Sequence, residues 1–191
     1  MGKDRRQLIL DAASRAFTEF GYKATTMDLV AKMANVGKGT IYTFFKNKEE
    51  LFDEIFSSLF KEMRIMADEV METEMPFHEK VHQALFAILE YRKSHLLTIK
   101  VFQESAQLGT PEVKEVIDRI ESMIILYIKT KIEQAIEDGE IENCHSELLA
   151  FTMYKLYIAL IFDWEKKHDP LEKETIANLL QLFIEKKLTA K

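Results

Sequence analysis

The stretch TTMDLVAKMANVGKGTIYTFFKNKEEL, residues 25–51, decides how this chain folds. Thr25 is a suitable cap for a helix, with Asp28 three positions later as the reciprocal acid. Apolar residues then fall on one helical face, namely Leu29, Val30, Met33 and Ala34. Asn35 tolerates the left-handed conformation of a sharp turn, and a second short helix follows from Lys38. Helix, tight turn and helix is the geometry that seats a recognition helix in the major groove of DNA.

The second helix of this pair has a polar outer surface and apolar residues, Ile41, Phe44 and Phe45, for inner contacts. Its outer surface carries hydrogen-bond donors at Lys38, Thr40, Tyr42, Thr43 and Lys46. Gly37 and Gly39 leave the first amides of the helix uncovered, at the positive end of the helix dipole, so a phosphate can approach closely. The alternative is an ordinary helical hairpin with a solvated basic face, because helix-turn-helix patterns also arise by chance.

Asn47 caps the next helix, with Glu50 at its third position. A long helix therefore starts directly behind the predicted recognition helix.

The run GYKATTMDLVAKMANVGKGTIYTFFKNKEELF, residues 21–52, resembles the DNA-binding signature of the TetR/AcrR family of bacterial transcriptional regulators. The resemblance is specific over about residues 5–52 and architectural beyond them. It implies phosphate contacts by Thr26, Lys38, Gly39, Tyr42 and Lys48, and contacts with base edges by Thr40 and Thr43. With Lys46 added from the polar surface, the predicted DNA-binding residues are Thr26, Lys38, Gly39, Thr40, Tyr42, Thr43, Lys46 and Lys48.

The chain departs from the family pattern at three positions. Asn35 stands where the family usually has Gly, Gly37 where it often has Ser, and Phe44 where it often has His. The first change is conformationally tolerable, and the second removes a cap and a hydroxyl contact. The third removes the basis for a DNA contact at residue 44.

Composition predicts an all-helical protein. The chain has 191 residues, 47% of them hydrophobic, with 3 Pro, 6 Gly and no alternating stretch of strand type. We expect about nine helices: an N-terminal helix-turn-helix domain of three helices over residues 1–47, and a larger helical domain over residues 48–191. A single Cys and the lack of a signal-like stretch lead us to expect a cytoplasmic protein.

The net charge of -6 conceals an uneven distribution. Residues 1–50 hold nine Lys or Arg against six Asp or Glu, which gives +3, and the remainder holds 17 against 26, which gives -9. The basic excess is thus confined to the predicted DNA-binding domain, as expected of a protein that approaches DNA with one end.

A helix of unusual composition is predicted over residues 146–167, where apolar residues lie almost all round from Leu148 to Trp164. Such a helix must bury two faces, and Lys155 at its middle makes it a poor membrane span. We predict a homodimer with its interface on this helix and the last one, formed by Phe151, Lys155, Ile158, Phe162, Leu179, Leu182 and Phe183. The alternative is the central helix of a monomeric bundle.

The family resemblance further implies that a small, largely apolar effector binds in the second domain and releases the DNA. Aromatic and Met side chains from separate helices are suited to line its cavity: Phe60, Met63, Phe86, Leu89, Phe102, Met123, Tyr127 and Tyr154. The same residues also fit a plain packed core, because helical spacing of apolar residues is first of all a packing signal.

One motif indicates a different class of protein. His78, Glu79 and His82 fit the pattern H-E-x-x-H, which on a helix places two imidazoles toward Zn²⁺ and a Glu as general base. Against this, Lys80 places a charge inside the motif, and a third ligand such as Glu104 has no motif of its own.

The interpretation that accounts for most of these features is a ligand-responsive DNA-binding repressor. It has double-stranded operator DNA, a small-molecule effector and a second copy of itself as partners, no membrane partner, no cofactor and no enzymatic activity. A metal-dependent hydrolase and a helical interaction module without DNA binding are the alternatives.

Overall fold

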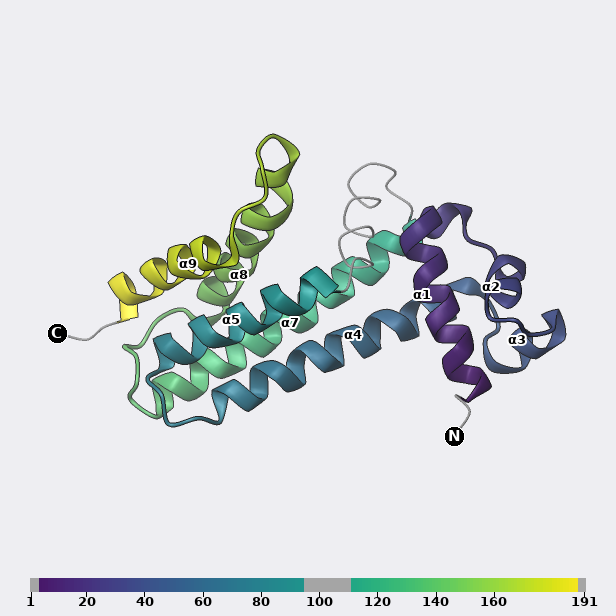
Figure 1. The fold of residues 1–191 in the computed structure, drawn as a ribbon. Coiled ribbons are helices and arrows are strands. Elements are labelled where there is room, and N and C mark those ends of the chain that lie inside the picture. The colour runs from purple at the N-terminus through teal and green to yellow at the C-terminus, as the bar shows by residue number, and fades with distance from the viewer. Residues whose placement is uncertain (1–3, 95–110, 189–191) are drawn as a thin grey trace. The chain divides into compact units, whose positions relative to one another are not determined.

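The computed structural model describes residues 4–94 and 111–188, and the regular elements in them are all helical (Figure 1). This confirms the predicted fold class. The described residues divide into two compact units, one of residues 4–62 and 111–118 and one of residues 63–94 and 119–188. The division falls inside helix α4, Lys48–Met71. The boundary after residue 47 remains a prediction.

Helix α1, Arg5–Ala24, has a tightly packed inner face in the first unit. Five fully buried residues form it, namely Ile9, Ala12, Ala13, Ala16 and Phe17. Three of them are alanines, whose small side chains allow another helix to cross closely. Gly21 interrupts the helix with φ 78° and ψ 169°, which suits a residue without a Cβ, and a further turn then runs to Ala24.

Helix α2, Met27–Met33, and helix α3, Lys38–Phe44, form the predicted helix-turn-helix. The cap of α2 is Thr26 and not Thr25: the Thr26 Oγ1 accepts a hydrogen bond from the Leu29 amide at 3.2 Å. Thr25 is fully buried and its hydroxyl donates to the Gly21 carbonyl instead. In the turn, Asn35 has the predicted positive φ, 54°. Gly37 has an ordinary φ of -66° as the residue before α3.

The start of α4 follows the sequence prediction closely. The Asn47 Oδ1 accepts a hydrogen bond from the Glu50 amide at 2.8 Å, and the Glu50 carboxylate accepts one from the Lys46 amide at 2.7 Å. These bonds satisfy amides that a helix start leaves without a partner. They fix the direction in which α4 leaves α3.

An aromatic cluster joins α1 to α4. The Phe52 ring lies 5.1 Å from Phe17, 4.8 Å from Tyr22 and 4.7 Å from Phe56, measured between ring centroids. The Arg6 guanidinium adds an ion pair to Glu54 and lies over the Phe45 ring. The helix-turn-helix therefore rests on a packed support made of both flanking helices.

The second unit has two apolar clusters. Helix α5, Phe77–Ser94, α7, Pro111–Glu137, and α8, Ser146–Ile158, build the first. Its buried residues are Phe77, Val81, Ile132, Ala135, Ile141 and Ala150. Helix α9, Lys173–Leu188, joins α5 and the turn after α8 in the second, whose buried residues are Leu89, Ile161, Ile176 and Leu180.

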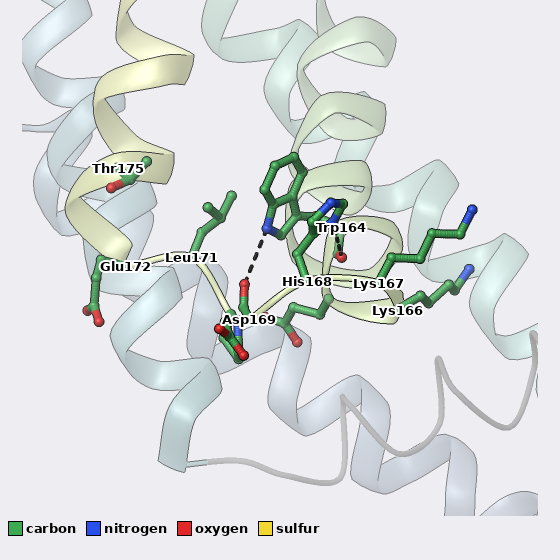
Figure 2. Close-up of a pocket in the computed structure, with 10 residues that line it drawn as sticks. Trp164, Lys166, Lys167, His168, Asp169, Leu171, Glu172 and Thr175 are labelled. Carbon is green, nitrogen blue, oxygen red and sulfur yellow. Dashed lines mark hydrogen bonds between the residues drawn. The ribbon is translucent and has the colours of Figure 1, made fainter.

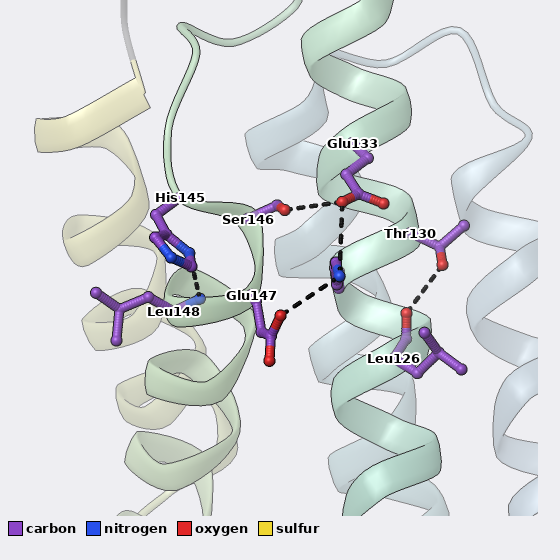
Figure 3. A network of polar contacts seen from close by, with 8 residues as sticks. Leu126, Thr130, Glu133, His145, Ser146, Glu147 and Leu148 are labelled. Atoms are coloured by element: carbon purple, nitrogen blue, oxygen red, sulfur yellow. Dashed lines mark hydrogen bonds and ion pairs between the residues drawn. The ribbon is translucent and has the colours of Figure 1, made fainter.

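Polar contacts link the end of α7 to the start of α8 (Figure 3). The His145 side chain caps α8 by accepting from the Leu148 amide at 3.3 Å. Lys129 pairs with Glu147 at 3.5 Å, and the Ser146 hydroxyl donates to Glu133 at 2.9 Å. Further along the same two helices, Lys155 pairs with Glu121 at 2.6 Å. The two helices are thus antiparallel and share a polar edge.

The predicted helix over residues 146–167 is α-helical in its first half only. After Ile158 the chain forms a π-helical turn, Ala159–Asp163, and a 3-10 turn, Trp164–Lys166. Trp164 then closes the connection to α9: its ring stacks on His168 with centroids 4.0 Å apart, and its N–H donates to the Asp169 carbonyl at 3.2 Å (Figure 2). A π turn holds more residues than an α turn, so it rotates later side chains away from the stripe that α spacing predicts.

Within residues 4–94 and 111–188, no helix combines the length and the apolar character that crossing a membrane requires.

Candidate nucleic-acid interface

Helices α2 and α3 each have one buried and one exposed side. Their buried residues are Met27, Val30, Ala31 and Ile41, with Ala34 and Phe45 just beyond the helix ends. Thr26, Lys38, Gly39, Tyr42, Thr43 and Lys46 are exposed, and Thr40 is partly buried. Phe44 is also 37% exposed, whereas the sequence placed it among the inner contacts. The exposed residues supply the polar surface that α3 was predicted to have.

Lys38 does not point freely into solvent. Its Nζ lies 2.8 Å from the Asp28 Oδ2, and both side chains are exposed, by 67% and 60%. This hydrogen bond raises the pKa of Lys38 above its ordinary value, and the charge of Asp28 adds to the effect. Asp28 therefore bridges α2 and α3 instead of completing a capping box.

The middle of α3 presents two hydroxyl groups and an open backbone. The Thr43 hydroxyl donates to the Thr40 carbonyl at 2.7 Å, and Tyr42 is 46% exposed. A Cβ placed on Gly39 would meet no atom within 4 Å. The backbone of Gly39 is therefore open to a ligand from outside.

Lys48 lies apart from this surface. Its Nζ donates to the Tyr22 carbonyl at 3.1 Å and the Thr25 carbonyl at 3.4 Å, and it lies 4.3 Å from the centre of the Tyr22 ring. The Tyr22 hydroxyl in turn donates to Glu49 at 2.9 Å. In this conformation the Lys48 ammonium ties the end of α1 to the start of α4. The phosphate contact of Lys48 remains a prediction.

Sequence reasoning missed two contacts at this site. The Asp28–Lys38 pair joins residues ten apart across a turn, and the contact of Lys48 with Tyr22 spans 26 residues. Neither spacing is a helical one, so no periodic signal identifies the pairs. The sequence signal at Asp28 was its capping position in the first turn of α2, and that signal does not indicate a contact with Lys38.

Comparison with known proteins identifies the family of this chain. Residues 9–55 match the model of the bacterial regulatory proteins of the tetR family. The HTH-type transcriptional regulator YhgD of Bacillus subtilis strain 168 is 67% identical over 190 residues, which cover 100% of each chain. The chain belongs to the TetR family. It is therefore a transcriptional regulator and not an enzyme.

Two further regulators extend the comparison. The fatty acid metabolism regulator protein of the same B. subtilis strain is 31% identical over 140 residues, covering 71% of this chain and 70% of the relative. The transcriptional regulator FadR from B. subtilis, solved in complex with stearoyl-CoA, has a similar fold. Its TM-score is 0.74 at 22% identity, with 91% of this chain and 96% of that chain covered.

The residues predicted to bind an effector in this TetR-family chain occupy different surroundings. Tyr154 and Leu89 are buried, while Phe60, Met63, Phe86 and Tyr127 are partly buried. Leu89 belongs to the second apolar cluster, and Phe86 lies under the Lys173 ammonium at 4.2 Å. Met123 is 42% exposed, and Phe102 lies outside the described residues. The depression in Figure 2 is lined by the connection before α9 and holds none of these residues.

Tyr127, one of the predicted effector residues on α7, takes part in a set of polar contacts with Asp68 on α4. The Tyr127 hydroxyl donates to the Asp68 Oδ1 at 2.9 Å, and Lys131 pairs with the same oxygen at 2.7 Å. Burial raises the pKa of Tyr127, and the hydrogen bond to Asp68 raises it further. Burial acts against ionisation of Asp68 too, but the hydrogen bonds from Lys131 and Tyr127 and the charges of Lys131 and Arg64 outweigh it and lower the pKa of Asp68. Tyr127 thus joins α4 to α7 through its polar end.

The predicted dimer residues are partly available for a partner. Phe151 is 44% and Leu179 38% exposed, Lys155 is exposed, and Ile158 is partly buried. Phe162, in the π turn, packs against the second apolar cluster. The side chains of Leu182 and Phe183 lie outside the described part of the chain. Leu126 and Leu148, which the sequence did not single out, are 62% and 59% exposed.

The H-E-x-x-H motif does not assemble a metal site in the part of the chain that the structure describes. There, no group of three or more His, Cys, Asp or Glu could hold a metal ion. The His78 Nε2 lies 3.9 Å from its neighbour Glu79, and the His82 Nδ1 is buried without a hydrogen-bond partner. Glu104 lies outside the described residues. The hydrolase interpretation has no support from the relatives, which are regulators.

Proposed function

We propose that this regulator is a repressor that binds a near-palindromic operator as a homodimer and is released by a small, largely apolar effector. The observation that carries the proposal is the division of α2 and α3 into a buried apolar side and an exposed polar side with Thr26, Lys38, Tyr42, Thr43 and Lys46. A short helix with exposed donors, supported from behind by packed helices, suits insertion into the major groove.

We assign the polar residues of this surface to two kinds of contact. Thr26, Lys38, Gly39, Tyr42 and Lys46 contact phosphates and position the helix, while Thr40 and Thr43 face base edges and contribute sequence preference. The open space at Gly39 supports a close approach of a phosphate to the backbone. For Lys48 we infer a positioning role, because its ammonium already has two carbonyl partners.

The dimer face that we propose runs along α8 and α9. Phe151 and Leu179 are large apolar side chains exposed in the single chain, as an interface requires. A two-fold dimer presents two recognition helices to successive major grooves, about 34 to 36 Å apart. This geometry explains why the operator should be near-palindromic.

For the effector we propose a molecule with a fatty acyl chain. This class is supported by the relatives that regulate fatty acid metabolism and by the complex of the similar fold with stearoyl-CoA. Helix α4 begins behind the recognition helix and carries Asp68 in its later turns, in the second unit. A ligand that displaces this part of α4 favours a spacing of the two recognition helices that no longer fits the operator. A preference of a few kcal/mol for that state is sufficient.

The proposal is tested by selecting duplexes from a random-sequence pool with the purified protein and titrating the recovered site. We expect a near-palindromic site, a dimer by light scattering at micromolar concentration, and affinity that falls with salt. Saturating stearoyl-CoA should then release the duplex. A monomeric protein without salt-dependent DNA affinity contradicts the proposal. If the dimer binds its site but stearoyl-CoA does not release the duplex, only the proposed effector class is contradicted.

A further inference from the structure

The Asp28–Lys38 pair places a carboxylate on the surface that the proposed function turns toward DNA. The two residues come from different helices, their charged atoms are 2.8 Å apart, and both side chains are more than half exposed. We propose that Asp28 is a specificity-determining residue that weakens binding to duplexes of unrelated sequence. The inference rests on the proposed DNA-binding function of α2 and α3.

The carboxylate acts first by neutralising Lys38. Binding to unrelated DNA depends on cations that neutralise phosphates and release counterions. A phosphate that takes Lys38 must either displace Asp28 or lie within a few ångströms of its negative charge, which repels it. Asp28 therefore removes about one phosphate contact from the sequence-independent part of binding.

At a matching site the Asp28 carboxylate can itself make a base contact. A carboxylate in the major groove accepts a hydrogen bond from the amino group of cytosine, which releases Lys38 for the phosphate contact assigned to it. The repulsion is then offset by base contacts that unrelated sequences do not offer. Specificity of this kind combines an attractive contact at the right site with a repulsive one at wrong sites.

Neighbouring carboxylates differ from Asp28 in their partners. Glu49 accepts a hydrogen bond from the Tyr22 hydroxyl, and Glu50 accepts one from the Lys46 amide. Both bonds hold the start of α4 in place. The Asp28 carboxylate instead holds the charged end of a lysine on the recognition helix.

The experiment measures binding of the full chain to a random-sequence duplex of about 30 base pairs at several salt concentrations, by fluorescence anisotropy. The variants are Asp28→Asn, Lys38→Met and the double variant. Glu72→Gln serves as the control, because it removes the same charge from an exposed residue just after α4, in the second unit. Far-UV circular dichroism verifies that each variant is folded, and Asp28→Ser replaces Asp28→Asn if the latter is not.

We expect Asp28→Asn to bind the unrelated duplex about fivefold more tightly at low salt, with a salt slope steeper by about 0.9. In the Lys38→Met background the same change should give a smaller gain and no change of slope. On the selected operator, Asp28→Asn should gain less, so that the ratio of operator to unrelated affinity falls.

Binding of Asp28→Asn no tighter than that of Glu72→Gln overturns the inference while the wild type still binds DNA. An equal gain with and without Lys38 also overturns it, because the effect would then be a general one of net charge. Failure of the wild type and all variants to bind any duplex contradicts the proposed function itself, and the inference with it.

Discussion

The two units of this regulator hold their helices together by different means. In the first unit, the rings of Phe17, Tyr22, Phe52 and Phe56 form one cluster, and side chains such as Thr26 and Asn47 cap the helices locally. In the second unit, polar contacts between distant residues join α4 to α7 at Asp68, α7 to α8 at Glu121, and α5 to α9 at Glu90. Exposed ion pairs contribute about 0–1 kcal/mol each. The first unit thus relies on one aromatic core with local caps, and the second adds to its two apolar clusters polar contacts that each contribute little.

The largest effect is expected from breaking the aromatic cluster. Phe52→Ala removes a ring that contacts three others and is 1% exposed, so we expect a loss of about 3–5 kcal/mol in unfolding free energy. Chemical denaturation measures the loss. Leu126→Ala is the control, because Leu126 is 62% exposed and should change stability by less than about 0.5 kcal/mol. Similar losses in the two variants would contradict the contribution assigned to the aromatic cluster.

A smaller effect is expected from the polar contact in the second unit. Tyr127→Phe removes the hydroxyl that donates to Asp68, while Lys131 keeps its contact with the same carboxylate. We expect a loss of about 1 kcal/mol near neutral pH, measured by denaturation. A loss as large as that of Phe52→Ala would contradict the small contribution assigned to this polar contact.

The pH dependence follows from the direction of the two pKa shifts. Because the pKa of Tyr127 is raised above its ordinary 10.0, its contribution is complete below about pH 10 and is lost as the pH rises further. The lowered pKa of Asp68 gives a contribution that is present above 3.8 and is lost as the pH falls below that value. The stability difference between wild type and Tyr127→Phe should therefore narrow above pH 10. A difference that stays constant there would contradict the assigned hydrogen bond.

The lysines that begin α3 and α4 sharpen the comparison within the first unit. Lys38 is exposed, whereas Lys48 bonds two carbonyls and lies over the Tyr22 ring. Lys48→Met should cost about 1 kcal/mol of stability and weaken DNA binding without changing the salt slope. Lys38→Met should leave stability within about 0.5 kcal/mol of the wild type. If Lys48→Met instead reduces the salt slope of DNA affinity by about 0.9, Lys48 contacts a phosphate, as the family resemblance implies.

Local signals explain which parts of this structure the sequence predicts. The cap at Asn47, the turn at Asn35 and the polar surface of α3 follow from residue type and short spacing. The cap of α2 was placed one residue early because two threonines stand side by side, and the burial of Thr25 decides between them. The π turn after Ile158 gives no composition signal, so the stripe through Phe162 could not be placed correctly.

Long-range polar contacts lie beyond such signals. Asp68 and Tyr127 are 59 residues apart, and each fits an amphipathic helix equally well with other partners. Pairing of this kind depends on how helices pack, which periodicity alone leaves open. The exposed polar side of α3 was therefore predictable from spacing, while the partners of Asp28 and Lys48 and the surroundings of the effector residues were not.

The smallest effect on stability, and the sharpest separation of stability from function, is expected at Gly39. A Cβ on this residue meets no atom within 4 Å, and its φ is not in the left-handed region, so Gly39→Ala introduces no strain in the free protein. Alanine favours the helical state over glycine, so we expect a gain of a few tenths of a kcal/mol in unfolding free energy. The added methyl group nevertheless occupies the space through which a phosphate reaches the backbone in the proposed complex. DNA affinity should therefore fall about threefold to tenfold while stability rises slightly, as measured by anisotropy and denaturation on the same preparation.

Gly139→Ala is the contrasting variant: its φ of 73° makes alanine strained, so stability should fall while DNA affinity is unchanged. If Gly39→Ala binds DNA as well as the wild type, the close approach at Gly39 is wrong, and the phosphate contacts of α3 must come from its side chains alone.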